Sequence, residues 1–375
     1  MLPSLLIPSF ALLLAATLSL YLAPVLIRAA LRYGIVDRPS TALKQHKEPV
    51  PYLGGLVVFV AFLLALALTF PFEPRVLAIL LAASLVVAVG LVDDLGTLTP
   101  KDKLIGQIIA ALVLVKAGVK IEIEVWPFPL DEILSVLWMV TCMNALNIVD
   151  VSDGLATSTG LVGSLGAFGV ALVNGEAMIA TMAAALFGAL AGFLVFNRQP
   201  ARMYLGDTGS MLIGALLGAL AMIGRYSETN QVSAFFVPLA LLGVPLFDLV
   251  LVIVARLLAG RPIYHGSRDH FAVRLKDHGL SARAVARLAS LVGLVVIGAG
   301  VGTIFLHNGP ALAVAAATCA LGVGSGVGLL VRFPPRALDE GRSPASLPQE
   351  EASTAARATA QTSKQTSTQT TEPAA

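Results

Sequence analysis

Residues 130–174 read LDEILSVLWMVTCMNALNIVDVSDGLATSTGLVGSLGAFGVALVN. Two apolar segments, 130–149 and 156–174, are each long enough to cross a bilayer, and a short polar connection joins them. Polar residues recur at every third position within and beside this connection: Asn144, Asn147, Asp150 and Asp153. Because carboxylates are costly next to hydrocarbon, the pattern predicts a polar functional site at one end of a pair of membrane helices.

The polar residues of this stretch converge only if the helix is interrupted. On a continuous α-helix each step of three residues rotates about 300°, so Asn144 and Asp153 would lie on nearly opposite faces. Gly154 is a residue type that favours such a break. We therefore predict that the helix unwinds near residues 151–154.

The rest of the chain shares this apolar character. Of its 375 residues, 57% are hydrophobic and 13% are charged, whereas soluble domains carry about a quarter charged residues. Segments of spanning or near-spanning length lie at 4–27, 53–71, 76–92, 104–119, 130–149, 156–174, 177–196, 208–224, 233–256, 286–306 and 310–331. We predict an all-α, polytopic integral membrane helix bundle of about 10–11 transmembrane helices.

Lys and Arg predict the orientation of the bundle. With the N-terminus outside, the cytoplasmic connections and their helix ends hold sixteen of the 25 basic residues, and the opposite side holds four. This asymmetry is a strong positive-inside signal. The N-terminus lacks the basic region of a signal peptide, so the first apolar run is interpreted as a retained span. The net charge of +2 is too small to indicate nucleic-acid binding.

The composition changes near Phe333 to Pro, Ser, Thr, Gln and Ala. Such a segment cannot bury enough apolar surface to offset the entropy lost on ordering. We predict a transmembrane domain over residues 1–332, which carries the candidate catalytic residues, and a disordered cytoplasmic tail over residues 333–375.

Two further acidic motifs lie at predicted helix ends on the cytoplasmic side. In GLVDDLGTLTPKDKLIGQ (90–107), Asp93 and Asp94 close a helix, where the negative end of the helix dipole calls for a counter-cation. One of them could face a site while the other pairs with Lys101 or Lys103, or both could be solvated surface groups. In MYLGDTGSMLIG (203–214), Asp207 is either a plain N-cap or, beside the other carboxylates, a Mg²⁺ ligand.

Two cytoplasmic connections are basic. The first, residues 36–55, carries Lys44 and His46 between three prolines, and the last long one carries Arg268 and His270. An arginine can hold a diphosphate by paired hydrogen bonds, and a lysine can grip a phosphate. Ordinary solvated loops remain the alternative for both connections. Asp248 lies inside a predicted span and is either paired structurally or part of the site.

Together, these five segments resemble the polyprenyl-phosphate N-acetylhexosamine-1-phosphate transferases. The resemblance rests on the run from Lys44 to Gly55, the Asp93-Asp94 pair, the N-x-x-N-x-x-D-x-x-D-G stretch and GDTGS, in that order. It implies a helix bundle with a cytoplasmic active-site cleft that transfers a sugar-1-phosphate from a UDP-sugar to a lipid phosphate and releases UMP. It also implies that Asp207 coordinates Mg²⁺, with Mn²⁺ as the alternative ion.

The resemblance assigns roles to further residues. Asp93, proposed as base, and Asp94 would form an acidic pair near the reacting phosphates, and Asp150 and Asp153 would complete the catalytic set. The residues that would bind substrate are Lys44, His46, Asn144, Asn147, Arg268 and His270.

Two departures from the family pattern affect these roles. Val151 and Ser152 follow Asp150, where relatives have D-G-x-D-G, and the lost glycine constrains the turn. Relatives also carry H-x-H-H in the last long connection, and this chain keeps only His270 of the three. The second departure argues against the muramoyl-pentapeptide enzyme of the family and weakens the sugar-binding role of this loop.

The implied partners are a UDP-N-acetylhexosamine, with UDP-GlcNAc favoured, a polyprenyl (undecaprenyl) phosphate and the lipid bilayer. The implied setting is the plasma membrane, where the product starts a lipid-linked glycan of the cell envelope. The sequence leaves open the sugar, a homodimer and the choice between one-step attack and a covalent aspartyl intermediate. The alternative hypotheses are a secondary transporter, a non-catalytic scaffold and a CDP-alcohol phosphotransferase. The motif of the last class needs Ala-Arg soon after Asp-Gly, and this chain has Leu155-Ala156 there.

Overall fold

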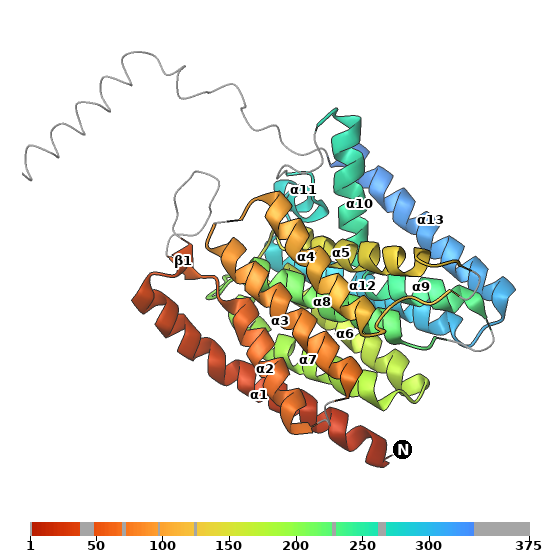
Figure 1. Ribbon diagram of the computed structural model, residues 1–375. Coiled ribbons are helices and arrows are strands. Elements are labelled where there is room, and N and C mark those ends of the chain that lie inside the picture. Colours follow the sequence, from red (N-terminus) through yellow and green to blue (C-terminus); the bar gives the residue numbers. More distant parts are fainter. Residues whose placement is uncertain are drawn as a thin grey trace, which may run out of the picture. The chain divides into compact units, whose positions relative to one another are not determined.

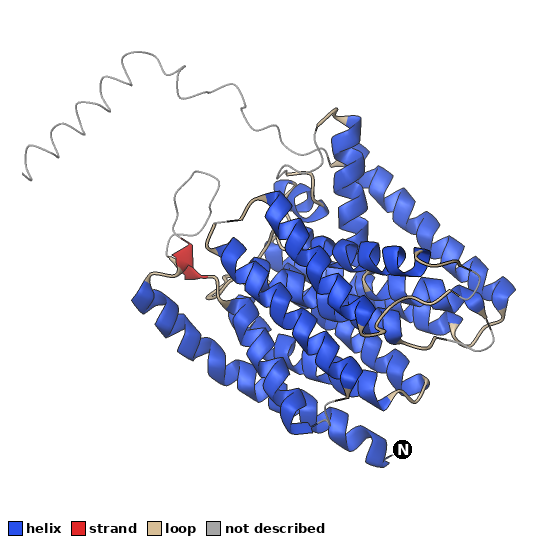
Figure 2. Cartoon of the chain, in the orientation of Figure 1, coloured by secondary structure: helices blue, strands red, loops and turns tan. Residues whose placement is uncertain are grey.

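The protein is described by a computed structural model over residues 2–37, 49–69, 73–96, 98–123, 126–226, 230–261 and 268–333, which belong to one compact unit, Met1–Pro334. This part of the chain is almost entirely helical (Figure 2). The helices are α1 (Leu2–Tyr33), α2 (Gly54–Thr69), α3 (Pro74–Asp94), α4 (Pro100–Lys116), α5 (Leu130–Val149), α6 (Leu155–Val173), α7 (Ala177–Asn197), α8 (Gly206–Ile223), α9 (Gln231–Leu241), α10 (Gly243–Leu258), α11 (Phe271–Asp277), α12 (Ala282–Thr303) and α13 (Asn308–Arg332). The predicted tail, residues 333–375, lies outside the described residues except for Phe333, and it stays a prediction.

Each of the eleven apolar segments of the sequence corresponds to a helix or a helix pair. Among the described residues, eight helices are long and apolar enough to cross a membrane. The pair α9 and α10 is long and apolar enough only when both helices are taken together, and it is bent by 76°, as in a broken span or a re-entrant loop. Helices α2 and α4 have only 16 and 17 residues. The prediction of a multi-pass, all-α membrane protein is therefore confirmed.

Helix α8 lies at the centre of the bundle. It packs against α2, α3, α5 and α6 (Figure 1). Of the 18 residues of α8, 78% are buried inside the protein, whereas only 6% of the most apolar 18-residue stretch of α13 are buried. A helix that other helices surround cannot tilt or rotate without moving its neighbours. The first turn of α8, which carries Asp207, is therefore held from several sides.

Glycines allow the neighbours of α8 to approach its backbone closely. A Cβ atom built on Gly55 of α2 would lie 2.2 Å from the backbone nitrogen of Gly209. One built on Gly90 of α3 would lie 2.4 Å from the Cα atom of Thr208, and one on Gly214 would lie 2.4 Å from the carbonyl oxygen of Cys142 in α5. Small residues at helix contacts are the usual means of close packing in membranes.

We expect Gly90→Ala to destabilise the protein by about 1–3 kcal/mol, because the added methyl group overlaps backbone atoms of α8 that cannot move aside. The midpoint of thermal unfolding in detergent should fall. The matched control is Gly298→Ala in α12, where nothing lies within 4 Å of the added Cβ atom. An equal midpoint for both variants would contradict this account of the packing.

A two-stranded antiparallel ribbon lies at the base of the first connection. Strand β1 (Val36–Asp37) pairs with β2 (Val50–Pro51). The carbonyl oxygen of Pro51 accepts a hydrogen bond from the backbone N–H of Tyr204 at 2.8 Å. Gly55 N–H donates to the carbonyl oxygen of Leu205 at 2.9 Å. The ribbon is therefore fastened to the segment that leads into α8.

Candidate active site

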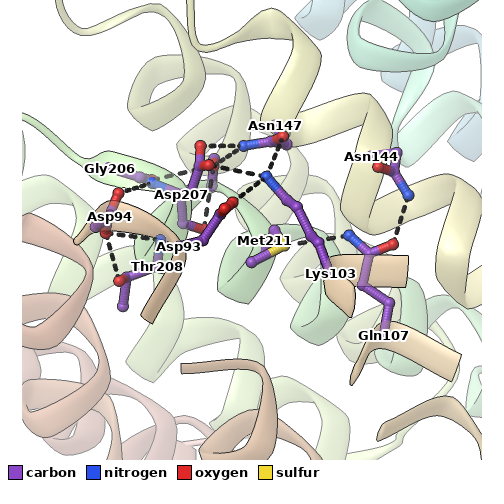
Figure 3. A network of polar contacts seen from close by, with 11 residues as sticks. Asp93, Asp94, Lys103, Gln107, Asn144, Asn147, Gly206, Asp207, Thr208 and Met211 are labelled. Atoms are coloured by element: carbon purple, nitrogen blue, oxygen red, sulfur yellow. Dashed lines mark hydrogen bonds and ion pairs between the residues drawn. The ribbon is translucent and has the colours of Figure 1, made fainter. Parts of the chain in front are cut away.

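A carboxylate from another helix caps the start of α8. Asp94, the last residue of α3, accepts hydrogen bonds from the backbone N–H groups of Asp207 (2.7 Å) and Thr208 (3.1 Å) and from the Thr208 hydroxyl (2.6 Å). The free N–H groups of a helix start carry partial positive charge, which suits an anion. Gly206 enters the helix with a φ of 73°, and a Cβ atom there would lie 2.7 Å from Oδ2 of Asp94. Asp94 thus fixes the turn that carries Asp207 (Figure 3).

Lys103 lies where four helices meet. Its Nζ atom is 2.7 Å from Oδ2 of Asp93 and 2.8 Å from Oδ2 of Asp207, and it donates to Oδ1 of Asn147 at 3.0 Å. The Asn147 amide also donates to Oδ1 of Asp207 at 2.6 Å and to the Ser210 hydroxyl at 3.0 Å. Figure 3 shows these side chains converging from α3, α4, α5 and α8. We call Asp93, Lys103, Asn147 and Asp207 the Lys103 cluster.

A second layer of polar contacts supports the Lys103 cluster. The amide nitrogen of Asn144 donates to Oε1 of Gln107 at 2.7 Å, and Nε2 of Gln107 lies 3.2 Å from the sulfur of Met211. Each of these three residues lies about one helical turn from a member of the cluster on the same helix. The layer therefore holds the register of α4, α5 and α8. Asn144, predicted to bind substrate, belongs to this layer, and its substrate role stays a prediction.

The predicted interruption of the helix is confirmed. Helix α5 ends at Val149, Gly154 has a left-handed φ of 71°, and α6 begins at Leu155. Within this break, Oδ2 of Asp153 accepts a hydrogen bond from the backbone N–H of Ala201 at 3.0 Å. Asp153 thus ties the break to the segment between α7 and α8.

Asp150 lies in the same break, near the other carboxylates. Burial raises its pKa well above the usual range for an aspartate, and the carboxylates of Asp207, Asp94 and Asp153 raise this pKa further. Burial and negatively charged neighbours both disfavour the charged form of a carboxyl group. Asp150 is therefore close enough to the Lys103 cluster to respond to charge placed there.

A basic residue of α11 reaches the same break. Lys276 donates from Nζ to the carbonyl oxygen of Val151 at 3.3 Å. Burial lowers the pKa of Lys276, while the nearby Asp153 acts in the opposite direction. The break is thus flanked by a second lysine that the sequence pattern did not single out.

The remaining predicted residues of the last long connection form a separate group around α11. Asp248 of α10 is fully buried; its Oδ2 lies 2.9 Å from Nδ1 of His270, and its Oδ1 accepts from the backbone N–H of Phe271 at 2.9 Å. Asp248 is therefore paired structurally and caps α11. Arg268 donates to both oxygens of Asp277, at 2.8 and 3.1 Å. The substrate roles of Arg268 and His270 stay predictions, and so do those of Lys44 and His46, which lie outside the described residues.

The oxygens of the Lys103 cluster suit a hard divalent cation. They comprise two carboxylates and an amide oxygen, the ligands that Mg²⁺ accepts, and Mg²⁺ often uses only one or two carboxylates together with substrate phosphates. Among the described residues, no group of three or more His, Cys, Asp and Glu side chains could hold a metal ion. The residues present therefore fit a metal that is shared with a phosphate-bearing substrate, and fit a purely protein-bound metal poorly.

Comparison with known proteins gives concordant matches. The pattern of Glycosyl transferase family 4 matches residues 76–225. A "Probable undecaprenyl-phosphate N-acetylglucosaminyl 1-phosphate transferase" of Bacillus subtilis is 32% identical over 74% of this chain and 79% of that protein. A "Decaprenyl-phosphate N-acetylglucosaminephosphotransferase" of Mycolicibacterium smegmatis is 35% identical over 79% of this chain and 82% of that protein.

A relative with a different name is also similar. A "Phospho-N-acetylmuramoyl-pentapeptide-transferase" of Moorella thermoacetica is 32% identical over 69% of this chain and 87% of that protein. The region matched by the family pattern carries all four members of the Lys103 cluster. The chain is therefore a transferase and belongs to glycosyl transferase family 4, the family of the polyprenyl-phosphate N-acetylhexosamine-1-phosphate transferases.

Proposed function

We propose that this protein transfers a sugar-1-phosphate, with GlcNAc-1-phosphate favoured, from a UDP-N-acetylhexosamine to a polyprenyl phosphate such as undecaprenyl phosphate, and releases UMP. The observation that carries the proposal is the Lys103 cluster at the start of α8, where a lysine, two carboxylates and an amide converge at the end of a membrane helix. The names of the relatives from Bacillus subtilis and Mycolicibacterium smegmatis support the acceptor and the sugar.

The chemistry requires two anions that repel each other to approach. An oxygen of the lipid phosphate would attack the β-phosphorus of the UDP-sugar, and the bond from this phosphorus to the UMP oxygen would break. Positioning and charge neutralisation are the main tasks of a protein in such a transfer. Lys103 supplies a positive charge next to Asp207, while the backbone N–H groups of Asp207 and Thr208 donate to Asp94 and hold the turn in place. Asp93 would act as the base toward the lipid phosphate.

A magnesium ion is part of the proposal. Asp207 would hold it, with Asp93 and the Asn147 oxygen beside it, and Mn²⁺ is the alternative ion. When bound, the ion would neutralise charge on the diphosphate as the UMP oxygen departs. Asp150 and Asp153 lie in the adjoining helix break, where they would line the cleft for the nucleotide and its diphosphate.

The proposed orientation places this chemistry inside the cell. The N-terminus would lie outside the plasma membrane, and the Lys103 cluster, the connection with Lys44 and His46, and α11 would face the cytoplasm, where UDP-sugars are made. The product would start a lipid-linked glycan of the cell envelope. A homodimer is compatible with the proposal and is not required by it.

We expect the purified protein in detergent to release UMP only when a UDP-sugar, polyprenyl phosphate and Mg²⁺ are all present. A panel of UDP-sugars, assayed for UMP and for transfer of labelled sugar to lipid, tests this directly. UDP-GlcNAc should be the best donor. Release of UMP without lipid acceptor would contradict the transfer, and ion or sugar flux into vesicles without UMP release would favour a transporter instead.

A further inference from the structure

Every hydrogen of the Lys103 ammonium group has a partner. An ammonium group has three donors and no acceptor, and Nζ of Lys103 has oxygens of Asp93, Asp207 and Asn147 at 2.7, 2.8 and 3.0 Å. The side chain is only 16% exposed. The arrangement is a cation held by three converging oxygens, two of them charged.

The same three oxygens are the ones that suit Mg²⁺. Carboxylate and amide oxygens are ligands of hard divalent cations as well as acceptors for ammonium. A lysine ammonium and a divalent ion cannot share one set of oxygens, because their charges repel at such short range and their ligands are the same atoms. Occupation of this position by one cation therefore excludes the other.

The Lys103 side chain is able to move away from these three oxygens. Its ammonium group ends a flexible four-carbon chain, which can move without a change in the backbone. The helix behind it need not move either, because Gln107, one turn further along α4, is fixed by the Asn144 amide at 2.7 Å. The side chain can therefore leave the oxygens while α4 keeps its register against α5.

We propose that Lys103 is a resident cation that holds the metal position until substrate and metal arrive, and that the displaced ammonium then holds the diphosphate of the donor. The proposal rests on the proposed function for its metal and its diphosphate. It also accounts for the close approach of the two carboxylates, because the positive charge of Lys103 lies between them and offsets one of their two negative charges. It also predicts that metal binds weakly alone and more tightly when a diphosphate gives the ammonium a new partner.

A structural ion pair predicts the opposite effect of removing Lys103. If the ammonium only held α3, α4 and α8 together, its loss would loosen the site and weaken metal binding. If it competes with the metal, its loss leaves two unpaired carboxylates and strengthens metal binding. The sign of the change in metal affinity therefore separates the two roles.

The test measures binding of Mn²⁺ alone to the full-length protein in detergent, from the electron paramagnetic resonance signal of the free ion. We expect Lys103→Met to bind Mn²⁺ at least about tenfold more tightly than the unmodified protein. Lys103→Gln, which removes the charge but keeps a hydrogen-bonding side chain, should change the affinity in the same direction if the methionine variant folds poorly. The matched control is Lys101→Met, because Lys101 is an exposed lysine two residues away on the same helix, and its affinity should not change.

Two further measurements complete the experiment. Adding UDP should tighten Mn²⁺ binding to the unmodified protein by more than it does for Lys103→Met, because only the former has a lysine to relocate. Asp207→Asn should weaken Mn²⁺ binding in both backgrounds. If Lys103→Met and Lys103→Gln bind Mn²⁺ no more tightly than the unmodified protein while Asp207→Asn still weakens binding, the competition is disproved and the proposed metal role survives. If Asp207→Asn leaves Mn²⁺ binding unchanged, the metal role itself fails, and the competition fails with it.

Discussion

Replacement of Asp207 by asparagine is expected to lower sugar-1-phosphate transfer by about a hundred- to a thousandfold, the scale seen when one preorganised electrostatic group is removed from a reacting centre. The side chain keeps its shape but loses its charge. Its Oδ1 now accepts from Asn147 at 2.6 Å and its Oδ2 lies 2.8 Å from Nζ of Lys103, so an amide nitrogen at either position faces a donor. Transfer of labelled sugar from UDP-GlcNAc to polyprenyl phosphate measures the loss.

A second substitution at the same position separates the loss of charge from the loss of a metal ligand. Asp207→Glu keeps the carboxylate but moves it by one methylene group, so the Mg²⁺ concentration for half-maximal rate should rise by about tenfold or more. At saturating Mg²⁺ this variant should be clearly faster than Asp207→Asn. The matched control is Asp131→Asn, at the opposite end of α5 from Asn147, and it should transfer at a rate close to that of the unmodified protein. Near-full activity of Asp207→Asn would remove the metal role.

Most of the fold follows from the sequence because burial in a membrane leaves a strong and simple pattern. Each of the eleven apolar segments forms a helix or, for 233–256, a pair of helices, because a segment in lipid has to satisfy its own backbone hydrogen bonds. The bend of 76° inside the segment 233–256 was not predicted. Signals for it are present in retrospect: Pro238 lies within α9 and Pro245 in the first turn of α10, and a proline removes a backbone donor.

The sequence predicts which residues form the site, but it predicts only part of the contacts between them. Asp93, Asn147 and Asp207 were expected to converge, and the structure brings them onto one lysine. For Lys103, the sequence predicts only a possible ion pair with one member of the Asp93-Asp94 pair. Sequence spacing shows which residues share a helix face, but contacts between α3, α4, α5 and α8 depend on how each helix is rotated against the others, and no periodicity specifies that rotation.

The same limit explains why the two members of the acidic pair could not be told apart. Adjacent helical residues point about 100° from each other, so Asp93 and Asp94 had to differ, but the sequence did not say which would meet the lysine. The structure directs Asp93 to Lys103 and Asp94 to the first turn of α8. Both were predicted to be catalytic, and the contacts of Asp94 raise the question whether it acts on the substrate or on Asp207.

Asp94→Asn answers that question. We expect it to lower the free energy of unfolding by about 2–4 kcal/mol, because hydrogen bonds to a charged acceptor are worth about 1.5–3 kcal/mol each and the charge also favours the helix start. One carboxylate oxygen becomes an amide nitrogen that faces either the Asp207 N–H or the Thr208 N–H and hydroxyl, donor against donor. The midpoint of thermal unfolding in detergent measures the change.

Transfer activity should fall together with stability, by at least about tenfold, because the turn that carries Asp207 loses its attachment to α3 and small displacements of a reacting group have large effects on rate. The matched control is Asp102→Asn: Asp102 accepts from the backbone N–H and the hydroxyl of Thr99 at the start of α4, but within its own helix and at the surface. That variant should keep both its unfolding midpoint and most of its activity. If Asp94→Asn instead unfolds at the same temperature as the unmodified protein and is inactive, Asp94 acts on the substrate directly, and the cap it forms on α8 is incidental to the reaction.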